Sequence, residues 1–116
     1  MPTPISRRLA LLLPCLVTAP LVASLSAPAP ALASNQLHMK SGCIACHMVD
    51  RKLVGPSYKE IAVKYKGRAD AVPFLTQRVR KGGPGNWGTV PMAPNDVSKL
   101  NDAELKTLLA WILASA

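Results

Sequence analysis

Two thiols three residues apart, followed at once by an imidazole, are the side chains of this sequence whose types and spacing could do covalent and metal chemistry. They are Cys43, Cys46 and His47, in the stretch GCIACHMVD. Residues three apart lie on one side of a helical turn, so the two sulfurs can point the same way. A disulfide, a thiol redox pair, a zinc site and a haem attachment site are the uses to compare.

Three of these uses explain the trio poorly. A disulfide between Cys43 and Cys46 would close a very small loop and restrain little of the unfolded chain. A thioredoxin-like pair needs a strand before it and a parallel sheet around it, and residues 34–116 contain no convincing strand pattern. Zinc needs two more ligands, and His38 and His47 are the two histidines of the chain. The C-x-x-C-H spacing of a c-type haem explains all three residues, with His47 as the proximal ligand of the iron.

A second axial ligand of the iron must come from a segment that can reach the face of the haem opposite His47. Residues 83–95 form a long stretch dense in proline and glycine, and loops of this length are usually functional. Met92 lies in it, 45 residues after His47, with Pro91 and Pro94 stiffening the backbone around it. Methionines often only fill core space. In a haem-bearing chain we expect the Met92 thioether to bind the iron.

Helical signals dominate the remainder of the chain, so the predicted fold class is all-α. Ser34 is predicted to cap a first helix over 35–41, which ends at Gly42. Ser57 and Glu60 form a capping-box pattern that opens a second helix. Further helices are predicted from a cap at Asp70 to about residue 80, and from Asn101 onward with apolar residues at Leu105, Leu108, Leu109 and Ile112.

The first 33 residues have the pattern of a cleaved secretory signal peptide. Arg7 and Arg8 precede an apolar run, and small residues with Ala31-Leu32-Ala33 end it. A retained membrane anchor is the alternative, but prolines interrupt the run. We expect export to the periplasm by the general secretion route and a mature domain of residues 34–116, with no stable membrane insertion after cleavage.

Six short stretches of residues 34–116 resemble the small class I cytochromes c of the bacterial c-551 type. They are GCIACH (42–47), VGPSYK (54–59), QRV (77–79), WG (87–88), PMAPN (91–95) and LAWIL (109–113). The resemblance covers nearly all of the predicted mature domain. It implies a cytochrome c fold, with about four to five short helices wrapped around one haem c that is attached through Cys43 and Cys46.

The resemblance also implies roles for residues around the haem. The carbonyl of Pro56 would accept the second N–H of His47, Trp87 with help from Arg78 would bind a haem propionate, and Asn95 would contact the Met92 sulfur. Such contacts orient and tune the ligands. One departure is His38, which stands where the family usually has an aromatic or apolar residue in the first helix. We expect it to be an ordinary surface or partly buried residue that makes the contact with the last helix near Trp111 weaker or locally polar.

With both axial positions filled by His47 and Met92, the iron has no open position for a substrate, which predicts a one-electron carrier rather than an enzyme. A five-coordinate haem enzyme or gas-binding haem protein is the alternative. Without Arg7 and Arg8 the chain keeps 12 basic against 6 acidic residues, a net charge of +6 before the propionates. We therefore expect respiratory or photosynthetic redox partners with acidic docking surfaces, such as a terminal oxidase or a nitrite reductase, a monomeric state and no nucleic-acid binding.

Overall fold

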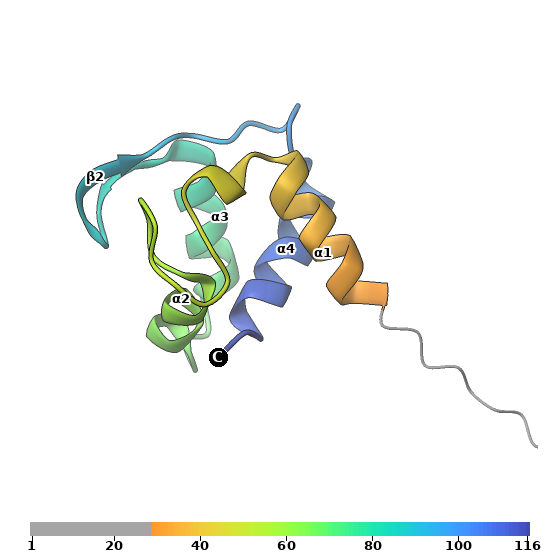
Figure 1. Ribbon diagram of the computed structural model, residues 1–116, viewed down its shortest axis with the longest axis horizontal. Coiled ribbons are helices and arrows are strands. Elements are labelled where there is room, and N and C mark those ends of the chain that lie inside the picture. Colours follow the sequence, from red (N-terminus) through yellow and green to blue (C-terminus); the bar gives the residue numbers. More distant parts are fainter. Residues whose placement is uncertain (1–28) are drawn as a thin grey trace, which may run out of the picture.

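The computed structural model describes residues 29–116, with four α-helices, one short 3-10 helix and a small hairpin in this part of the chain. The elements follow in the order α1 (Ala29–Lys40), η1 (Cys43–Ala45), α2 (Tyr58–Tyr65), α3 (Ala71–Lys81), β1 (Gly83–Gly85), β2 (Gly88–Met92) and α4 (Asp102–Leu113). The all-α prediction is confirmed (Figure 1).

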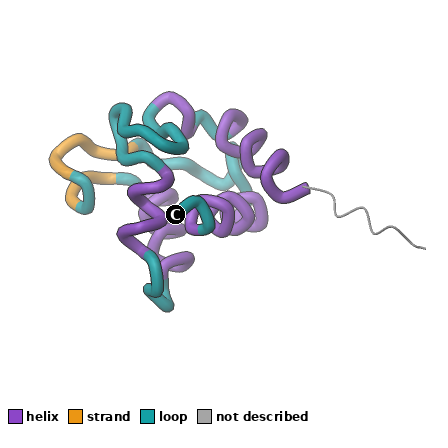
Figure 2. Tube along the Cα trace, turned by 60° about the horizontal axis from the view of Figure 1, so that its bottom comes forward, coloured by secondary structure: helices purple, strands orange, loops and turns teal. Residues whose placement is uncertain are grey.

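Helix α4 is the centre of the packing, because α1, α2 and α3 each lie against it. Its buried side chains recur at helical spacing on one face, as the sequence pattern predicts. The hairpin and α1 lie at opposite ends of the fold (Figures 1 and 2). This arrangement leaves the space between α2, α3, α4 and the hairpin for the candidate site.

Two of the predicted helix starts are formed by complete capping boxes. The Ser57 and Asn101 side chains accept the backbone N–H of Glu60 and Glu104, whose carboxylates accept the N–H of Ser57 and Asn101 in return. Asp70 stands at the start of α3, but its carboxylate binds Arg68 instead of capping the helix.

The predicted start of the first helix is wrong. Helix α1 begins at Ala29 rather than after Ser34, and Ser34 is a fully buried residue inside it. Alanine and leucine in 29–33 are strong helix formers, so the helix continues through the expected cap. The rest of the predicted signal peptide, residues 1–28, lies outside the described residues.

The loop over 83–95 has structure that the sequence reading missed. Gly83 pairs with Met92 and Gly85 with Gly88 in an antiparallel hairpin with an irregular register. All three glycines have positive φ, a conformation that lets the backbone turn sharply. The hairpin therefore presents Met92 from a defined strand end.

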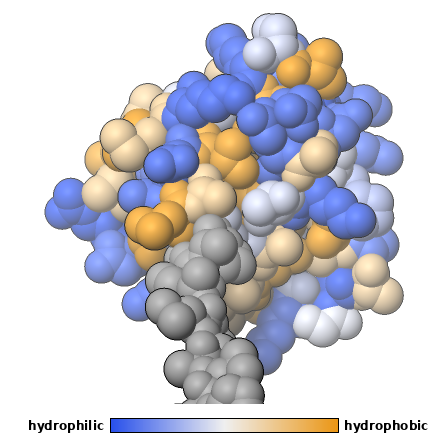
Figure 3. All heavy atoms as spheres, turned by 90° about the vertical axis from the view of Figure 1, so that its right-hand side faces the viewer, coloured by the Kyte–Doolittle hydropathy of each residue, from blue (hydrophilic) through white to orange (hydrophobic). Residues whose placement is uncertain are grey.

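The surface is mainly hydrophilic on the side of the molecule that carries α1, with separate hydrophobic areas between the polar ones (Figure 3). Among the described residues, the structure contains no helix that is both long and apolar enough to cross a membrane.

Candidate functional site

A cavity of about 400 Å³ lies between α2, α3, α4 and the hairpin. Its walls are mostly apolar and include much of the core of the fold. The core residues that line it are Tyr58, Tyr65, Leu75, Leu105, Leu108, Leu109 and Ile112. Seven of the eight site residues predicted from the sequence line it as well: Cys43, Cys46, His47, Pro56, Arg78, Trp87 and Met92.

Both cysteines of the motif stand at one edge of this cavity, on the short helix η1. Gly42, with φ of 76°, turns the chain out of α1 so that η1 can begin at Cys43. The His47 N–H donates to the Cys43 carbonyl over 2.9 Å, which places all three motif residues in one compact turn. Cys43 is half-buried, Cys46 is exposed, and neither is in a disulfide.

The His47 ring is buried and held on two sides. Its Nδ1 lies 2.7 Å from the carbonyl oxygen of Pro56, which is the hydrogen bond that the family resemblance implies. Gly55 lies against the same ring: a Cβ at this position would be 2.5 Å from His47 Cε1. The chain reaches this position because the Gly55 N–H donates to the Cys46 carbonyl over 2.8 Å. With Nδ1 held by Pro56, Nε2 is the ring atom left to bind a metal.

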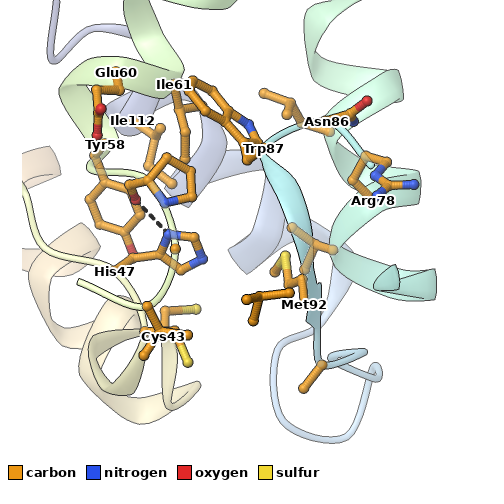
Figure 4. A pocket seen from close by; sticks show the side chains of 18 of the residues that line it. Cys43, His47, Tyr58, Glu60, Ile61, Arg78, Asn86, Trp87, Met92 and Ile112 are labelled. Atoms are coloured by element: carbon orange, nitrogen blue, oxygen red, sulfur yellow. Dashed lines mark hydrogen bonds between the residues drawn. The ribbon is translucent and has the colours of Figure 1, made fainter. Parts of the chain in front are cut away.

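Met92 lies on the opposite wall of the cavity from His47 (Figure 4). It ends β2, and its backbone passes so close to Gly82 at the end of α3 that a Cβ there would collide with the Met92 carbonyl oxygen. The imidazole and the thioether therefore face each other across an apolar space, although 45 residues separate them in the sequence.

Arg78 and Trp87 lie on the hairpin side of the cavity (Figure 4). The Arg78 guanidinium donates to the carbonyls of Gly83 (3.2 Å) and Pro84 (2.9 Å), which joins α3 to β1. Lys64 of α2 lies over the Trp87 ring, 4.2 Å from its centroid, and donates to the Asn86 carbonyl over 2.6 Å. These contacts hold two side chains that can hydrogen-bond an anionic group beside the cavity.

Asn95 is the predicted site residue that does not line the cavity. It is buried, and its side-chain N–H donates to the Ser41 carbonyl over 2.8 Å, while its side-chain oxygen has no partner. The Ser41 hydroxyl in turn lies 3.0 Å from the Cys43 sulfur. Asn95 thus links the segment after Met92 to the turn that carries the cysteines, and its expected contact with the Met92 sulfur stays a prediction.

Tyr58 lines the cavity and His38 contacts Tyr58, although the sequence reading gave neither a role in the site. The Tyr58 ring stacks on the His47 ring, with centroids 5.8 Å apart and planes inclined by 16°. Its hydroxyl lies 2.6 Å from Nδ1 of His38, which is more deeply buried than the expected surface or partly buried residue. Trp111 packs edge-on against Tyr58, so the contact of His38 with this region is locally polar, as expected.

The residues present fit a covalently bound haem. An apolar cavity, two free thiols at one edge, an imidazole and a thioether on facing walls, and two donors for propionates are the groups that a c-type haem requires. Within residues 29–116 no three His, Cys, Asp or Glu side chains gather into a metal site of their own, which leaves the zinc alternative without support there.

Comparisons with known proteins agree with this chemistry. The family model for cytochrome c matches residues 31–116. Cytochrome c-551 of Azotobacter vinelandii is 49% identical over 79 residues, which are 68% of this chain and 93% of that protein. Cytochrome c-552 of Hydrogenobacter thermophilus is 50% identical over 82 residues, 71% and 81% of the two chains. The crystal structure of Nitrosomonas europaea cytochrome c552 matches with a TM-score of 0.65 at 43% identity, covering 71% of this chain and 99% of that one.

The chain therefore belongs to the cytochrome c family. It is a small class I c-type cytochrome that carries one covalently bound haem c, and it is an electron-transfer protein rather than an enzyme. It passes electrons to and from other redox proteins.

Proposed function

We propose that the protein is an exported electron carrier whose iron is bound by His47 on one side and Met92 on the other. The observation that carries this proposal is the position of the two side chains on facing walls of one apolar cavity, with both cysteines at its edge. His47 and Met92 would together hold the iron from both walls, which would leave it no position for oxygen or a substrate.

The bound haem supplies a one-electron couple, and the protein controls its surroundings. The apolar walls exclude water, which keeps the charge on the iron in a low-dielectric environment. The Pro56 carbonyl holds Nδ1 of His47, so the imidazole presents one fixed nitrogen. Arg78 and Trp87 supply donors for the propionates, and the Lys64 contact keeps the Trp87 ring in place.

The substitution Met92→Ala tests the axial ligation. We expect the ferric absorption band near the red edge of the visible spectrum, which is diagnostic of sulfur bound to iron, to disappear. We also expect the reduction potential to fall, because a thioether stabilises ferrous iron.

Met48→Ala is the matched control, since Met48 lies beside His47 in the sequence and does not line the cavity. A Met92→Ala protein with an unchanged spectrum and potential would remove the proposed ligand. Rapid carbon monoxide binding by the unmodified protein would favour the five-coordinate alternative.

The site at which electrons leave is the cysteine edge of the cavity. Cys46 is exposed there, as is Ile44 two residues earlier in the chain, and two apolar side chains that line the cavity, Val54 and Val90, are exposed as well. Lys52 also lines the cavity. An apolar rim with a lysine beside it suits brief contact with partners that have acidic docking surfaces, such as a terminal oxidase or a nitrite reductase. We propose that the carrier acts as a monomer.

Export to the periplasm completes the proposal. A cleaved signal peptide over 1–33 would leave Ser34 as the first residue, inside the helix that the structure begins at Ala29. Mass spectrometry of the haem-bearing protein from the periplasm tests this: we expect the mass of residues 34–116 plus one haem. A retained N-terminal segment would contradict the predicted cleavage and leave the axial ligation untouched.

A further inference from the structure

His38 is a buried histidine that the proposed ligation does not use. It is 4% exposed, lies in α1 and shares a 2.6 Å hydrogen bond with the Tyr58 hydroxyl. Burial lowers the pKa of His38 and raises the pKa of Tyr58. Burial thus favours the uncharged form of both partners, so their contact is a hydrogen bond rather than an ion pair.

Tyr58 connects this pair to the axial imidazole. Its ring lies nearly parallel to the His47 ring, at 5.8 Å and 16°, in a stacked arrangement. His38 and Trp111 both meet Tyr58 edge-on, at 5.2 Å and 78° and at 5.6 Å and 77°. Tyr58 begins α2, His38 lies in α1 and Trp111 in α4, so three helices hold this one ring.

The His47 ring has two contacts besides Tyr58. The Pro56 hydrogen bond fixes the position of Nδ1, and Gly55 lies against the face of the ring near Cε1, because a Cβ there would be 2.5 Å from Cε1, 3.0 Å from Nδ1 and 3.1 Å from Nε2. The Tyr58 ring, nearly parallel to the imidazole, is the aromatic contact of that ring. The Tyr58 hydroxyl is in turn hydrogen-bonded to His38, twenty residues earlier in the chain.

We propose that His38 and Tyr58 are positioning residues for the axial imidazole: His38 anchors the Tyr58 hydroxyl, and Tyr58 holds the plane of the His47 ring. This inference rests on the proposed ligation of the iron by His47. The plane of an axial imidazole sets how unpaired spin is distributed over a ferric haem. A change in the plane therefore appears in the paramagnetically shifted haem methyl resonances and in the g values of the low-spin iron.

The test uses the haem-bearing protein and the variants Tyr58→Phe, His38→Phe and the double variant. Tyr58→Phe removes only the hydroxyl, and His38→Phe keeps an aromatic ring but removes the nitrogen. We expect each single change to shift the haem methyl pattern and the g values in the same direction. The double variant should shift them no further than either single change, because both break one hydrogen bond. His38→Asn, which offers an amide near the position of Nδ1, should restore most of the original pattern.

Leu100→Ala is the control for a merely structural effect. Leu100 is fully buried in the core but does not line the cavity, so its truncation should lower stability and leave the haem methyl pattern unchanged. Unchanged methyl shifts in both single variants would overturn this inference alone, as would additive shifts in the double variant or an equal shift in Leu100→Ala. A wild-type iron without an imidazole ligand would overturn the proposed ligation and this inference together.

Discussion

At the scale of single residues, Gly55 decides where the His47 ring can lie. It is a glycine because the ring lies against its Cα, and not because its backbone needs a positive φ. The hydrogen bond from Nδ1 to Pro56 fixes the other side of the ring at 2.7 Å. The imidazole thus has a hydrogen bond at one edge and a tight steric limit against its face near Cε1.

The substitution Gly55→Ala should displace the imidazole. The added Cβ would stand 2.5 Å from Cε1, so the ring or the backbone must shift, and overpacking of this kind costs about 1–3 kcal/mol. We expect lower stability together with altered ferric visible and paramagnetic NMR spectra. Gly67→Ala is the control: φ is +74° there with open space around the Cβ, so it should cost about 1–2 kcal/mol of strain and leave the spectra unchanged. Unaltered spectra in Gly55→Ala would contradict the steric role.

At the scale of the elements, the capping box of α4 is joined to α1 by an ion pair. The Glu104 carboxylate accepts the Asn101 N–H over 2.9 Å and pairs with Lys40 of α1 over 2.7 Å. The Lys40 contact, and after it the Asn101 N–H, hold the pKa of Glu104 below its usual value. One side chain therefore both starts α4 and ties it to α1.

This arrangement predicts how stability depends on pH. Because the pKa of Glu104 is lower in the folded protein than in the unfolded chain, its contribution is complete above the unfolded value near 4.5 and is lost as the pH falls through the folded value. Glu104→Gln should be less stable than the unmodified protein at pH 7, and the difference should shrink below pH 4.5, as measured by denaturant unfolding across pH. Asp50→Asn, whose carboxylate has no hydrogen bond or ion pair within residues 29–116, should show no such difference. A pH-independent loss in Glu104→Gln would refute the linkage.

At the scale of the whole molecule, the haem cavity and the hydrophobic core are largely the same place. Seven of the nine residues in the buried core cluster also line the cavity. Small domains bury too little apolar surface to be stable by a wide margin. The porphyrin therefore completes the core of this domain, and its covalent attachment makes that contribution permanent.

The chain without haem should be largely unfolded. Leaving a cavity of about 400 Å³ open would expose one side of the core to water, and a small domain has little stability to lose. Near-UV circular dichroism of chain produced without haem attachment should lack native aromatic signals, while the haem-bearing protein should show them. A native-like near-UV spectrum of the haem-free chain would contradict this prediction.

Net charge gives a prediction for association with partners. Residues 34–116 carry 12 basic and 6 acidic residues, so an acidic redox protein should be attracted over a distance. We expect the second-order rate of electron transfer to such a protein to fall by about tenfold or more as salt is raised, because salt screens exposed charges beyond about 10 Å at 0.1 M. Lys52→Gln, at the cavity, should lower the low-salt rate more than Lys99→Gln, which does not line it. A rate independent of salt would rule out the steering.

Several features could be predicted from the sequence because the interactions behind them are local. The C-x-x-C-H motif lies within one turn of chain, and the capping boxes at Ser57 and Asn101 each span four residues. The sequence also predicted the all-α fold, and it placed Met92 on a segment separate from the one that carries His47. The start of α1 was misplaced because Ser34 is a good cap, but the helix formers before it continue the helix.

Other features were decided only by the tertiary structure, because their partners come from distant parts of the chain. No local pattern indicates that His38 of α1 meets Tyr58 of α2 beside Trp111 of α4, or that Asn95 reaches back to Ser41. The hairpin that carries Met92 was missed because its strands are short and rich in glycine and proline. Residue types and spacing determined which chemistry this protein can do, whereas packing among three helices decided which aromatic side chains lie beside the imidazole.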